Sequence, residues 1–404
     1  YEMQRSLVGS EMCIRDRALL EHYTKLYNED DVAEEIVGTA DNFKSTNIGR
    51  RQAVTNAQMS YAQRAGAMVK ARIVEDMGAN ADDVNAEFEH FYAAYEANVQ
   101  KEIGMELQES FTLIRPHAGG KSTYDMQIFF IVSENAATRA RVRAYENALK
   151  ESEAAQRYAD RVSQFMPLDH IYVSTNVDYL PLVYEQLPQI DDEHILEEPI
   201  RRGTLASVAW STVVVAKRDP QACLLVTPAD QLILNEPQFQ HDMTDALGFA
   251  AHKEGIVITG IAPTRPETGY GYIQSDEDKQ IAPGIFAVKS FTEKPDANFA
   301  NIFVQEGNFL WNTGLLTYHV DVMLSNLYQL VPEYQMEIPR MMAEAESANP
   351  RLVPEFFTSL PNLGVDVSIL ERSNQVFVQQ AHFGWTDIGT WASLYDCLLY
   401  TSPS

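Results

Sequence analysis

Basic residues, cysteines and long apolar runs are all scarce in this chain of 404 residues. It contains 31 lysines and arginines against 57 aspartates and glutamates, which gives a formal net charge of −26. A chain with this excess of negative charge is a poor match for the phosphate backbone of nucleic acids. We therefore expect no nucleic-acid partner and look first to small-molecule chemistry.

The cysteines and the apolar runs exclude further classes of protein. Cys13, Cys223 and Cys397 are too few for a disulfide framework and too far apart for a zinc-binding pattern. The longest uncharged, mainly apolar stretch, Leu205 to Ala216, is too short to cross a bilayer and contains serine and threonine. With 45% hydrophobic residues the composition is that of a globular protein with room for two or three domains. We expect no membrane span.

Both ends of the chain carry a pattern that points to DNA rather than to protein structure. Residues 11–17 can be encoded by a DNA element whose reverse complement, in another frame, encodes Cys-Leu-Leu-Tyr-Thr-Ser at 397–402. Such inverted copies resemble translated sequencing adaptor. The alternative is a natural helix end and a natural tail that share this codon relation by chance. We expect residues 1–17 and 397–404 to be scars and the natural chain to be cut at both ends.

Residues 18–165 have the pattern of a small separate α+β domain of unknown function. Apolar residues spaced by three or four predict helices over 49–77 and 81–101. Alternating residues predict two antiparallel strands over 105–114 and 124–132, and 136–165 is predicted as one long helix. This order of elements resembles small envelope-lipoprotein domains of bacteria. No motif in the segment indicates a chemistry.

Residues 170–396 have a different rhythm. Apolar, strand-like runs at 171–175, 222–227 and 256–261 alternate with helical stretches at 179–187, 204–218 and 238–253. This alternation predicts an α/β, Rossmann-like fold, with a mostly parallel sheet and helices on both faces. Ligands of such sheets bind at the carboxyl ends of the strands. Side chains that directly follow the strands are therefore the candidates for a functional site.

Two aspartates are candidate metal ligands. Asp230 directly follows the apolar run that begins at Cys223, and Asp387 lies between the aromatic residues of Phe383 to Trp391. A carboxylate at the end of a parallel strand can hold a hard cation such as Mg²⁺. For Asp230, a plain helix-capping or turn aspartate is an equally good interpretation.

Three further motifs could hold a phosphorylated sugar. Gly269 and Gly271 lie on either side of Tyr270, where a ligand can approach the backbone closely, although a plain hairpin also fits. Glu293 and Lys294 offer a carboxylate for hydroxyl groups and an ammonium for phosphate, or form an ordinary exposed ion pair. Asn312, in an apolar strand, needs a backbone or ligand partner. Only the whole set in chain order is specific.

Taken in that order, the motifs resemble those of the mannose-1-phosphate guanylyltransferases (GDP-mannose pyrophosphorylases), a family of the sugar-nucleotide transferase superfamily. The resemblance covers about residues 171–395. The motifs that carry it are Glu198-Pro-Ile-Arg-Arg202 with Thr204, Pro228-Ala-Asp230, Arg265-Pro-Glu-Thr-Gly-Tyr-Gly-Tyr272, Phe291-Thr-Glu-Lys-Pro295, Trp311-Asn-Thr-Gly314 and Gly384-Trp-Thr-Asp-Ile-Gly-Thr-Trp391.

The resemblance implies a cytoplasmic enzyme that uses GTP, mannose 1-phosphate and Mg²⁺ to form GDP-mannose and diphosphate, and it leaves homo-oligomer formation open. Such phosphoryl chemistry depends on positioning and on charge neutralisation. Catalytic roles are implied for Asp230, Asp387 and Lys294. The two aspartates would hold the metal and Lys294 the sugar phosphate. On the substrates, the resemblance places Arg202 and Thr204 beside guanine, Gly269 and Tyr270 on the mannose side, and Glu293 and Asn312 on the mannose hydroxyls.

The sequence also departs from this family. Gly203 stands where asparagine is usual, and Gln231 where a histidine commonly follows the aspartate. More importantly, the family's glycine-rich triphosphate loop, Gly-Gly-x-Gly-x-Arg followed by Pro-Lys, is not found in residues 18–169. The loss of a single such donor typically costs a rate factor of about a hundred to a thousand. We therefore expect the domain to lack its first strand and loop, and the chain as written to be inactive.

Two accounts of the whole chain follow. In the first, a truncated transferase domain is joined to an unrelated, envelope-derived segment by an assembly error, with the seam between Phe165 and His170. In the second, the chain is a natural two-domain envelope or interaction protein whose degenerate nucleotide-sugar domain binds without catalysis. Titration with GTP and mannose 1-phosphate separates the two, because the second account requires binding.

Overall fold

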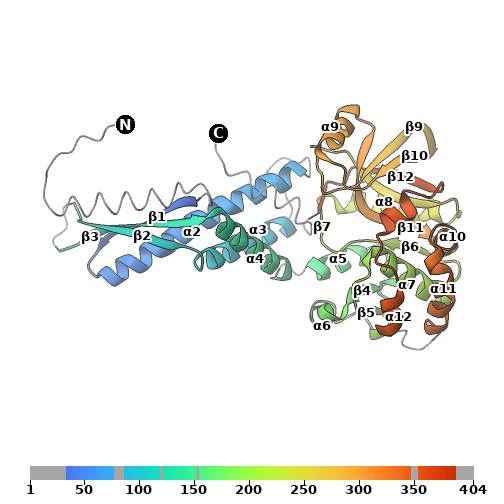
Figure 1. Cartoon of the computed structure of the whole chain (residues 1–404), viewed down its shortest axis with the longest axis horizontal. Helices are drawn as coiled ribbons and strands as arrows, with labels where there is room; N and C mark the ends of the chain where they lie inside the picture. The colour runs from blue at the N-terminus through green and yellow to red at the C-terminus, as the bar shows by residue number, and fades with distance from the viewer. Residues whose placement is uncertain (1–32, 77–85, 119–121, 152–153, 347–353, 388–404) are drawn as a thin grey trace. The chain divides into compact units, whose positions relative to one another are not determined.

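The computed structural model describes residues 33–76, 86–118, 122–151, 154–346 and 354–387 (Figure 1). The chain divides into two compact units, one with the elements from β1 to α4 and one with those from α5 to β13. The two terminal segments that we expect to be adaptor scars lie outside the described residues.

The first unit is an antiparallel sheet with three helices. Its strands β1 (Ala33–Phe43), β3 (Tyr124–Ser133) and β2 (Gln108–Pro116) lie in that order, and β2 and β3 pair where the alternating pattern predicted two strands. Its helices are α2 (Thr46–Asp76), α3 (Ala86–Ile103) and α4 (Glu134–Glu151). Strand β1 escaped prediction because it is rich in small and acidic residues. Its Gly38 lies so near α2 that a Cβ there would be 2.0 Å from the Ala53 carbonyl oxygen.

The predicted long helix over 136–165 is described as two helices. Helix α4 ends at Glu151, and α5 (Ala154–Ser163) belongs to the second unit. Val162 and Phe165 pack against the core of that unit. Arg161, almost fully buried, lies 3.3 Å from a carboxylate oxygen of Glu236. The end of the predicted helix is therefore part of the second unit's packing.

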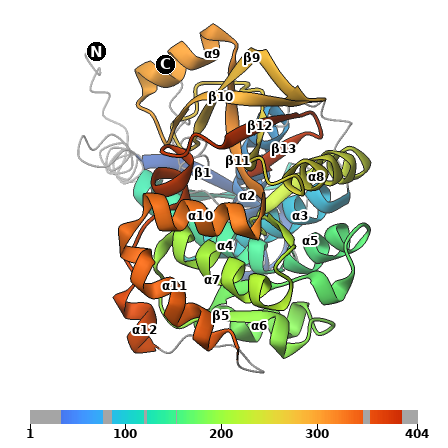
Figure 2. The ribbon, with the colours of Figure 1, turned by 90° about the vertical axis from the view of Figure 1, so that its right-hand side faces the viewer.

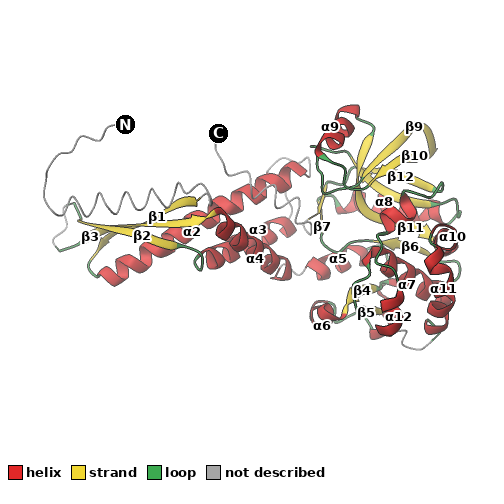
Figure 3. Ribbon diagram, viewed as in Figure 1, coloured by secondary structure: helices red, strands yellow, loops and turns green. Residues whose placement is uncertain are grey.

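The second unit is built on a six-stranded mixed sheet (Figure 3). Its strand order is β6 (Cys223–Val226), β11 (Phe309–His319), β8 (Ile256–Ile261), β12 (Val376–Ala381), β10 (Ile285–Thr292) and β9 (Tyr272–Ala282). The expected α/β fold class is confirmed. The sheet is less parallel than expected: β8 and β12 are parallel, whereas β11 runs antiparallel to both β6 and β8, between which it lies.

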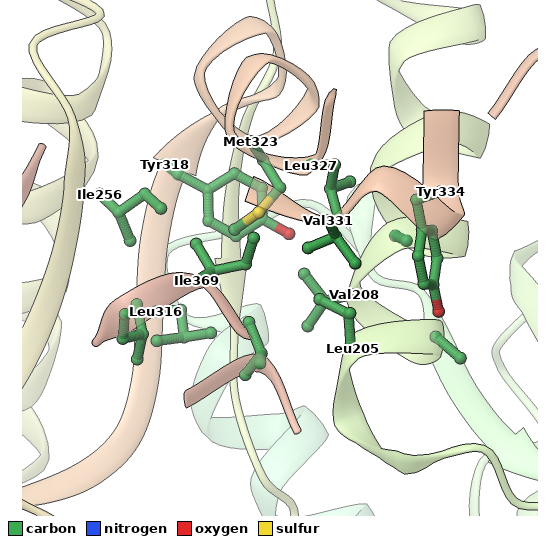
Figure 4. Packing of buried hydrophobic residues seen from close by; sticks show 14 of the residues in the cluster. Leu205, Val208, Ile256, Leu316, Tyr318, Met323, Leu327, Val331, Tyr334 and Ile369 are labelled. Carbon is green, nitrogen blue, oxygen red and sulfur yellow. The ribbon is translucent and has the colours of Figure 1, made fainter. Parts of the chain in front are cut away.

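Helices cover both faces of this sheet (Figure 2). Ile256 and Ile258 of β8 pack in one apolar cluster with α7 (Gly203–Arg218), α10 (Val320–Leu330) and α11 (Pro332–Glu344). Figure 4 shows Ile256 together with labelled residues of the three helices. Val257, between them, packs on the opposite face in the cluster of α8 (Glu236–Ala250). A strand buried on both faces explains why β8 is a continuous apolar run.

Shorter elements complete the unit. Strands β4 (Val173–Asn176) and β5 (Ile195–Glu198) form a parallel pair, and β7 (Gln231–Ile233) pairs with β13 (Trp385–Asp387). The remaining helices are α6 (Leu180–Gln186), α9 (Ala297–Glu306) and α12 (Pro354–Ser359), and Asp366–Leu370 form a π-helical turn. In the part of the chain that the structure describes, no helix is long and apolar enough to cross a membrane.

Candidate functional site

The short β7–β13 ladder brings the two predicted metal ligands near each other. Asp387 lies directly opposite Gln231, the residue that follows Asp230. Asp230 is half-buried, and desolvation raises the pKa of its carboxyl group. Asp230 directly precedes β7 and Asp387 ends β13, so both carboxylates lie at the same end of the ladder. Carboxylates are the hard oxygen donors that a divalent cation such as Mg²⁺ takes, so the residues present fit such an ion.

A bulge in β11 connects this aspartate pair to the next motif. Opposite β8 the register of β11 shifts between Asn312 and Leu316. The amide of Gln231 donates a hydrogen bond to the Thr313 carbonyl oxygen inside the bulge. Gly314 has a φ of +77° and lies close to the loop that precedes β7, because a Cβ on it would be 3.2 Å from Cγ of Pro228. Bulges commonly re-aim side chains in this way.

Asn312 and Glu293 meet across a glycine. The backbone N–H of Asn312 donates to the Gly271 carbonyl oxygen at 2.8 Å. A Cβ on Gly271 would lie 2.6 Å from Oε2 of Glu293 and 3.3 Å from Cβ of Asn312. A side chain at position 271 would therefore displace the Glu293 carboxylate and press on Asn312, and the glycine of the Gly-Tyr-Gly motif avoids this.

The Glu293–Lys294 pair combines burial and exposure. Burial, reinforced by the negative charge of Asp366, raises the pKa of Glu293 to about 6. Lys294 is exposed, and its Nζ lies 3.6 Å from Oε1 of Glu293. Its φ of +46° is left-handed, which costs a non-glycine residue about 1–2 kcal/mol. Strain of this kind often marks a functional position, because packing must hold it in place.

The loop before β9 is braced by a buried ion pair. Nη2 of Arg265 lies 2.5 Å from Oε2 of Glu267, and both side chains are almost fully buried. The other carboxylate oxygen of Glu267 accepts the N–H of Gly269 at 2.9 Å. Hydrogen bonds to both carboxylate oxygens fix the backbone conformation of the loop at Gly269.

Tyr270, which we expected to line the mannose side of the site, has a buried side chain. Its ring is 4% exposed and packs edge-on against Trp311 and Trp385, with centroid distances of 5.2 and 5.4 Å. The side chain therefore forms part of the aromatic core beneath the site. It acts on the site by supporting the backbone of Gly269 and Gly271 on either side.

Two predicted residues lie at the start of α7. Oγ1 of Thr204 accepts the backbone N–H of Val365 at 3.0 Å. The guanidinium of Arg202 donates to the carbonyl oxygens of Phe357 (3.4 Å) and Thr358 (2.8 Å). Arg202 thus ties this corner to the backbone at the end of α12, and the structure does not bring it to the Glu293–Asn312 pair.

Two acidic residues of the site were missed by the sequence analysis. Nδ2 of Asn312 donates to Oδ1 of Asp366 at 3.1 Å, and Oε1 of Glu371 accepts the backbone N–H of Glu293 at 3.3 Å. Both residues lie around the π-helical turn. Such a turn follows neither the helical nor the strand period, so it gave no signal in the residue pattern.

Polar side chains gathered around the strand ends and adjoining loops of an α/β sheet mark the usual place of ligand binding in such folds. A family model described as nucleotidyl transferase matches residues 161–402, and the chain belongs to this family.

The chain is also similar to individual curated proteins. Alginate biosynthesis protein AlgA of Pseudomonas fluorescens is 31% identical over 235 residues, which cover 57% of this chain and 48% of that protein. Mannose-1-phosphate guanylyltransferase RfbM of Salmonella typhimurium is 33% identical over 224 residues, or 53% of this chain and 46% of that protein. The chain spans about half the length of these curated relatives.

A solved structure supports the fold. The crystal structure named mannose-1-phosphate geranyltransferase from Thermus thermophilus superposes with a TM-score of 0.52 at 24% identity. The match covers 61% of this chain and 69% of that one. At this identity the likeness shows the fold alone.

Proposed function

We propose that residues 170–396 form a nucleotidyltransferase domain of the mannose-1-phosphate guanylyltransferase type, located in the cytoplasm. The observation that carries the proposal is the unbroken series of contacts between the motifs. Asp387 lies opposite Gln231, Gln231 bonds to Thr313, and the neighbouring Asn312 meets Glu293 across Gly271. One connected site thus contains two aspartates that can bind a cation and a Glu–Asn pair that can bind hydroxyl groups. This combination matches a substrate that is both phosphorylated and rich in hydroxyls.

Each residue has a defined part in this proposal. Asp230 and Asp387 would hold a divalent cation, which neutralises phosphate charge during nucleotidyl transfer. The half-buried carboxylate of Glu293 and the amide of Asn312 bind mannose hydroxyls. The exposed ammonium of Lys294 binds the sugar phosphate from the rim of the site. Thr204, at the start of α7, borders the guanine of GTP.

We also propose that this chain does not catalyse the formation of GDP-mannose. The family's glycine-rich triphosphate loop is not found in residues 18–169. Leu196 of β5 and Leu224 of β6 pack in the same apolar cluster, yet among the described strands no ladder joins β4 and β5 to β6. A strand missing from between these two parts of the second unit would account for this arrangement. The first unit has no chemistry in this proposal.

An assay of GDP-mannose formation tests the proposal. The purified 404-residue chain is incubated with GTP, mannose 1-phosphate and MgCl₂, with mannose-1-phosphate guanylyltransferase RfbM as the positive control. We expect product from the control and none from the chain. Product from the chain would disprove its inactivity. The type of domain is tested separately by binding of mannose 1-phosphate, since a chain that binds neither substrate lacks the proposed site.

A further inference from the structure

The segment Leu363–Glu371, which we call the bridging segment, contacts the site at two separate places. At one end, the Leu363 carbonyl oxygen accepts the N–H of Leu205 at 3.1 Å, and the N–H of Val365 donates to Thr204. At the other end, Glu371 accepts the N–H of Glu293. Between these contacts lies Asp366. The segment therefore joins the start of α7 to the Glu293–Asn312 pair.

The side chain of Asn312 is held by two hydrogen bonds of opposite sense. Its Oδ1 accepts the backbone N–H of Gly314 at 3.1 Å, and its Nδ2 donates to Asp366 Oδ1 at 3.1 Å. An amide turned by 180° would place Nδ2 against an N–H donor and Oδ1 against a carboxylate. One orientation is thus fixed, and it leaves one N–H and one lone pair of Asn312 for a ligand.

The position of Asp366 is itself rigid. Val365, Ile369 and Leu370, which flank it in the π-helical turn, are buried in the apolar cluster beneath α7 and α10. Burial raises the pKa of Asp366, while the hydrogen bond from Asn312 and the charge of Lys294 act in the opposite direction. A carboxylate placed at this cost in desolvation, on a backbone held by core packing, is suited to hold a neighbouring group in place.

We propose that Asp366 is a positioning residue of the sugar site, which fixes the amide of Asn312 in the orientation that mannose 1-phosphate requires. This inference rests on the proposed function, because it assigns Asn312 to the sugar. Asp366 need not touch the ligand. Its acceptor oxygen, more than its charge, is what the role requires.

Calorimetric titration of mannose 1-phosphate into the full-length chain and its variants tests the role. Asp366→Ala removes the acceptor, and we expect Kd to rise about tenfold, the effect of losing one hydrogen bond that orients Asn312. Asp366→Asn keeps an acceptor oxygen without the charge, and we expect Kd within about threefold of wild type. Asp366→Glu, which misplaces the carboxylate, should weaken binding and replaces the alanine variant if that variant fails to fold.

A matched control removes a nearby charge without touching Asn312. Asp296→Asn keeps the capping oxygen that Asp296 offers to the N–H groups of Asn298 and Phe299 at the start of α9, and it should leave Kd unchanged. Asparagine-selective ¹⁵N NMR, assigned with Asn312→Asp, gives a readout apart from binding. The side-chain amide of Asn312 should be shifted in wild type and lose that shift in Asp366→Ala.

The outcomes separate the two proposals. If wild type binds and Asp366→Ala binds equally well, the positioning role is wrong while the proposed function stands. If Asp366→Asn is as weak as Asp366→Ala, charge rather than positioning explains the effect, and the inference is again wrong. If wild type does not bind, the proposed function fails and takes the sugar-site role with it, whereas the NMR shift still reports whether Asp366 holds Asn312.

Discussion

Arg265 and Glu267 form a buried ion pair, with Nη2 and Oε2 2.5 Å apart, under the glycine motif of the site. The same carboxylate accepts the N–H of Gly269, and the guanidinium lies 5.1 Å from the centroid of the Trp311 ring. The ion pair therefore contacts both the aromatic core, at Trp311, and the backbone of the glycine loop, at Gly269.

Breaking this pair should be costly. Arg265→Met leaves the Glu267 carboxylate buried without its cation, and we expect the free energy of unfolding to fall by about 3–5 kcal/mol. Lys217→Met is the matched control, because it removes a partly exposed pair with Glu346 and should cost about 1 kcal/mol or less. Urea unfolding measures both. A loss in Arg265→Met no larger than in the control would contradict the structural role of the pair.

Gly203 is needed for both its backbone angle and its lack of a side chain. Its φ is +72°, and a Cβ would lie 2.3 Å from the Leu363 carbonyl oxygen of the bridging segment. Gly203→Ala should therefore destabilise the chain by more than about 2 kcal/mol, the cost of the left-handed angle plus the clash. Thermal and urea unfolding are the measurements.

Two other glycines separate these effects. Gly284 has the same φ but open space around it, so Gly284→Ala should cost only about 1–2 kcal/mol. Gly248, in helix α8 with nothing near its Cβ position, should stabilise the chain by up to about 1 kcal/mol when changed to alanine. Equal losses at Gly203 and Gly284 would show that the close approach to Leu363 is not real.

The residue pattern marked candidate site residues more readily than the fold around them. Glu293 and Gly271 became candidates because short polar or glycine-rich stretches at strand ends are visible locally. Asp366 was not, since its role depends on a π-helical turn and on a partner far away in the chain. Strand β11 inserts antiparallel between β6 and β8 through non-local pairing, so the mixed character of the sheet was equally invisible.

Glu293 should make stability depend on pH. Its pKa of about 6 in the folded chain is above the ordinary value of 4.5, so the folded state holds this proton more tightly than the unfolded state. The stability that this group contributes is complete below about pH 4.5 and is lost as the pH rises to about 6.

Glu293→Gln tests this dependence. The neutral amide removes the loss, so the variant should be more stable than wild type at pH 7 by at most about 2 kcal/mol, with a flatter profile between pH 4.5 and 6. Glu306→Gln, at the exposed end of α9, is the control. If the free energy of unfolding depended on pH in the same way for wild type and Glu293→Gln between pH 4.5 and 6, the carboxylate would not be desolvated as described.

The aspartate pair should bind a divalent cation. We expect Mn²⁺, followed by the loss of its free electron paramagnetic resonance signal, to bind wild type and to bind Asp230→Asn or Asp387→Asn more than about tenfold more weakly, because a hard cation needs carboxylate oxygens. Asp321→Asn, in an exposed pair with Lys253, controls for adsorption to the acidic surface. Equal Mn²⁺ binding by all four proteins would rule out a site at the β7–β13 ladder.

We propose that the sugar half of a nucleotidyltransferase site is intact in this chain. Isothermal titration of mannose 1-phosphate into the full-length protein, with MgCl₂ present, tests that statement most directly. We predict saturable binding to one site per chain, which Asn312→Ala abolishes. Absence of binding by the folded wild-type chain, or unchanged binding in Asn312→Ala, would contradict the account.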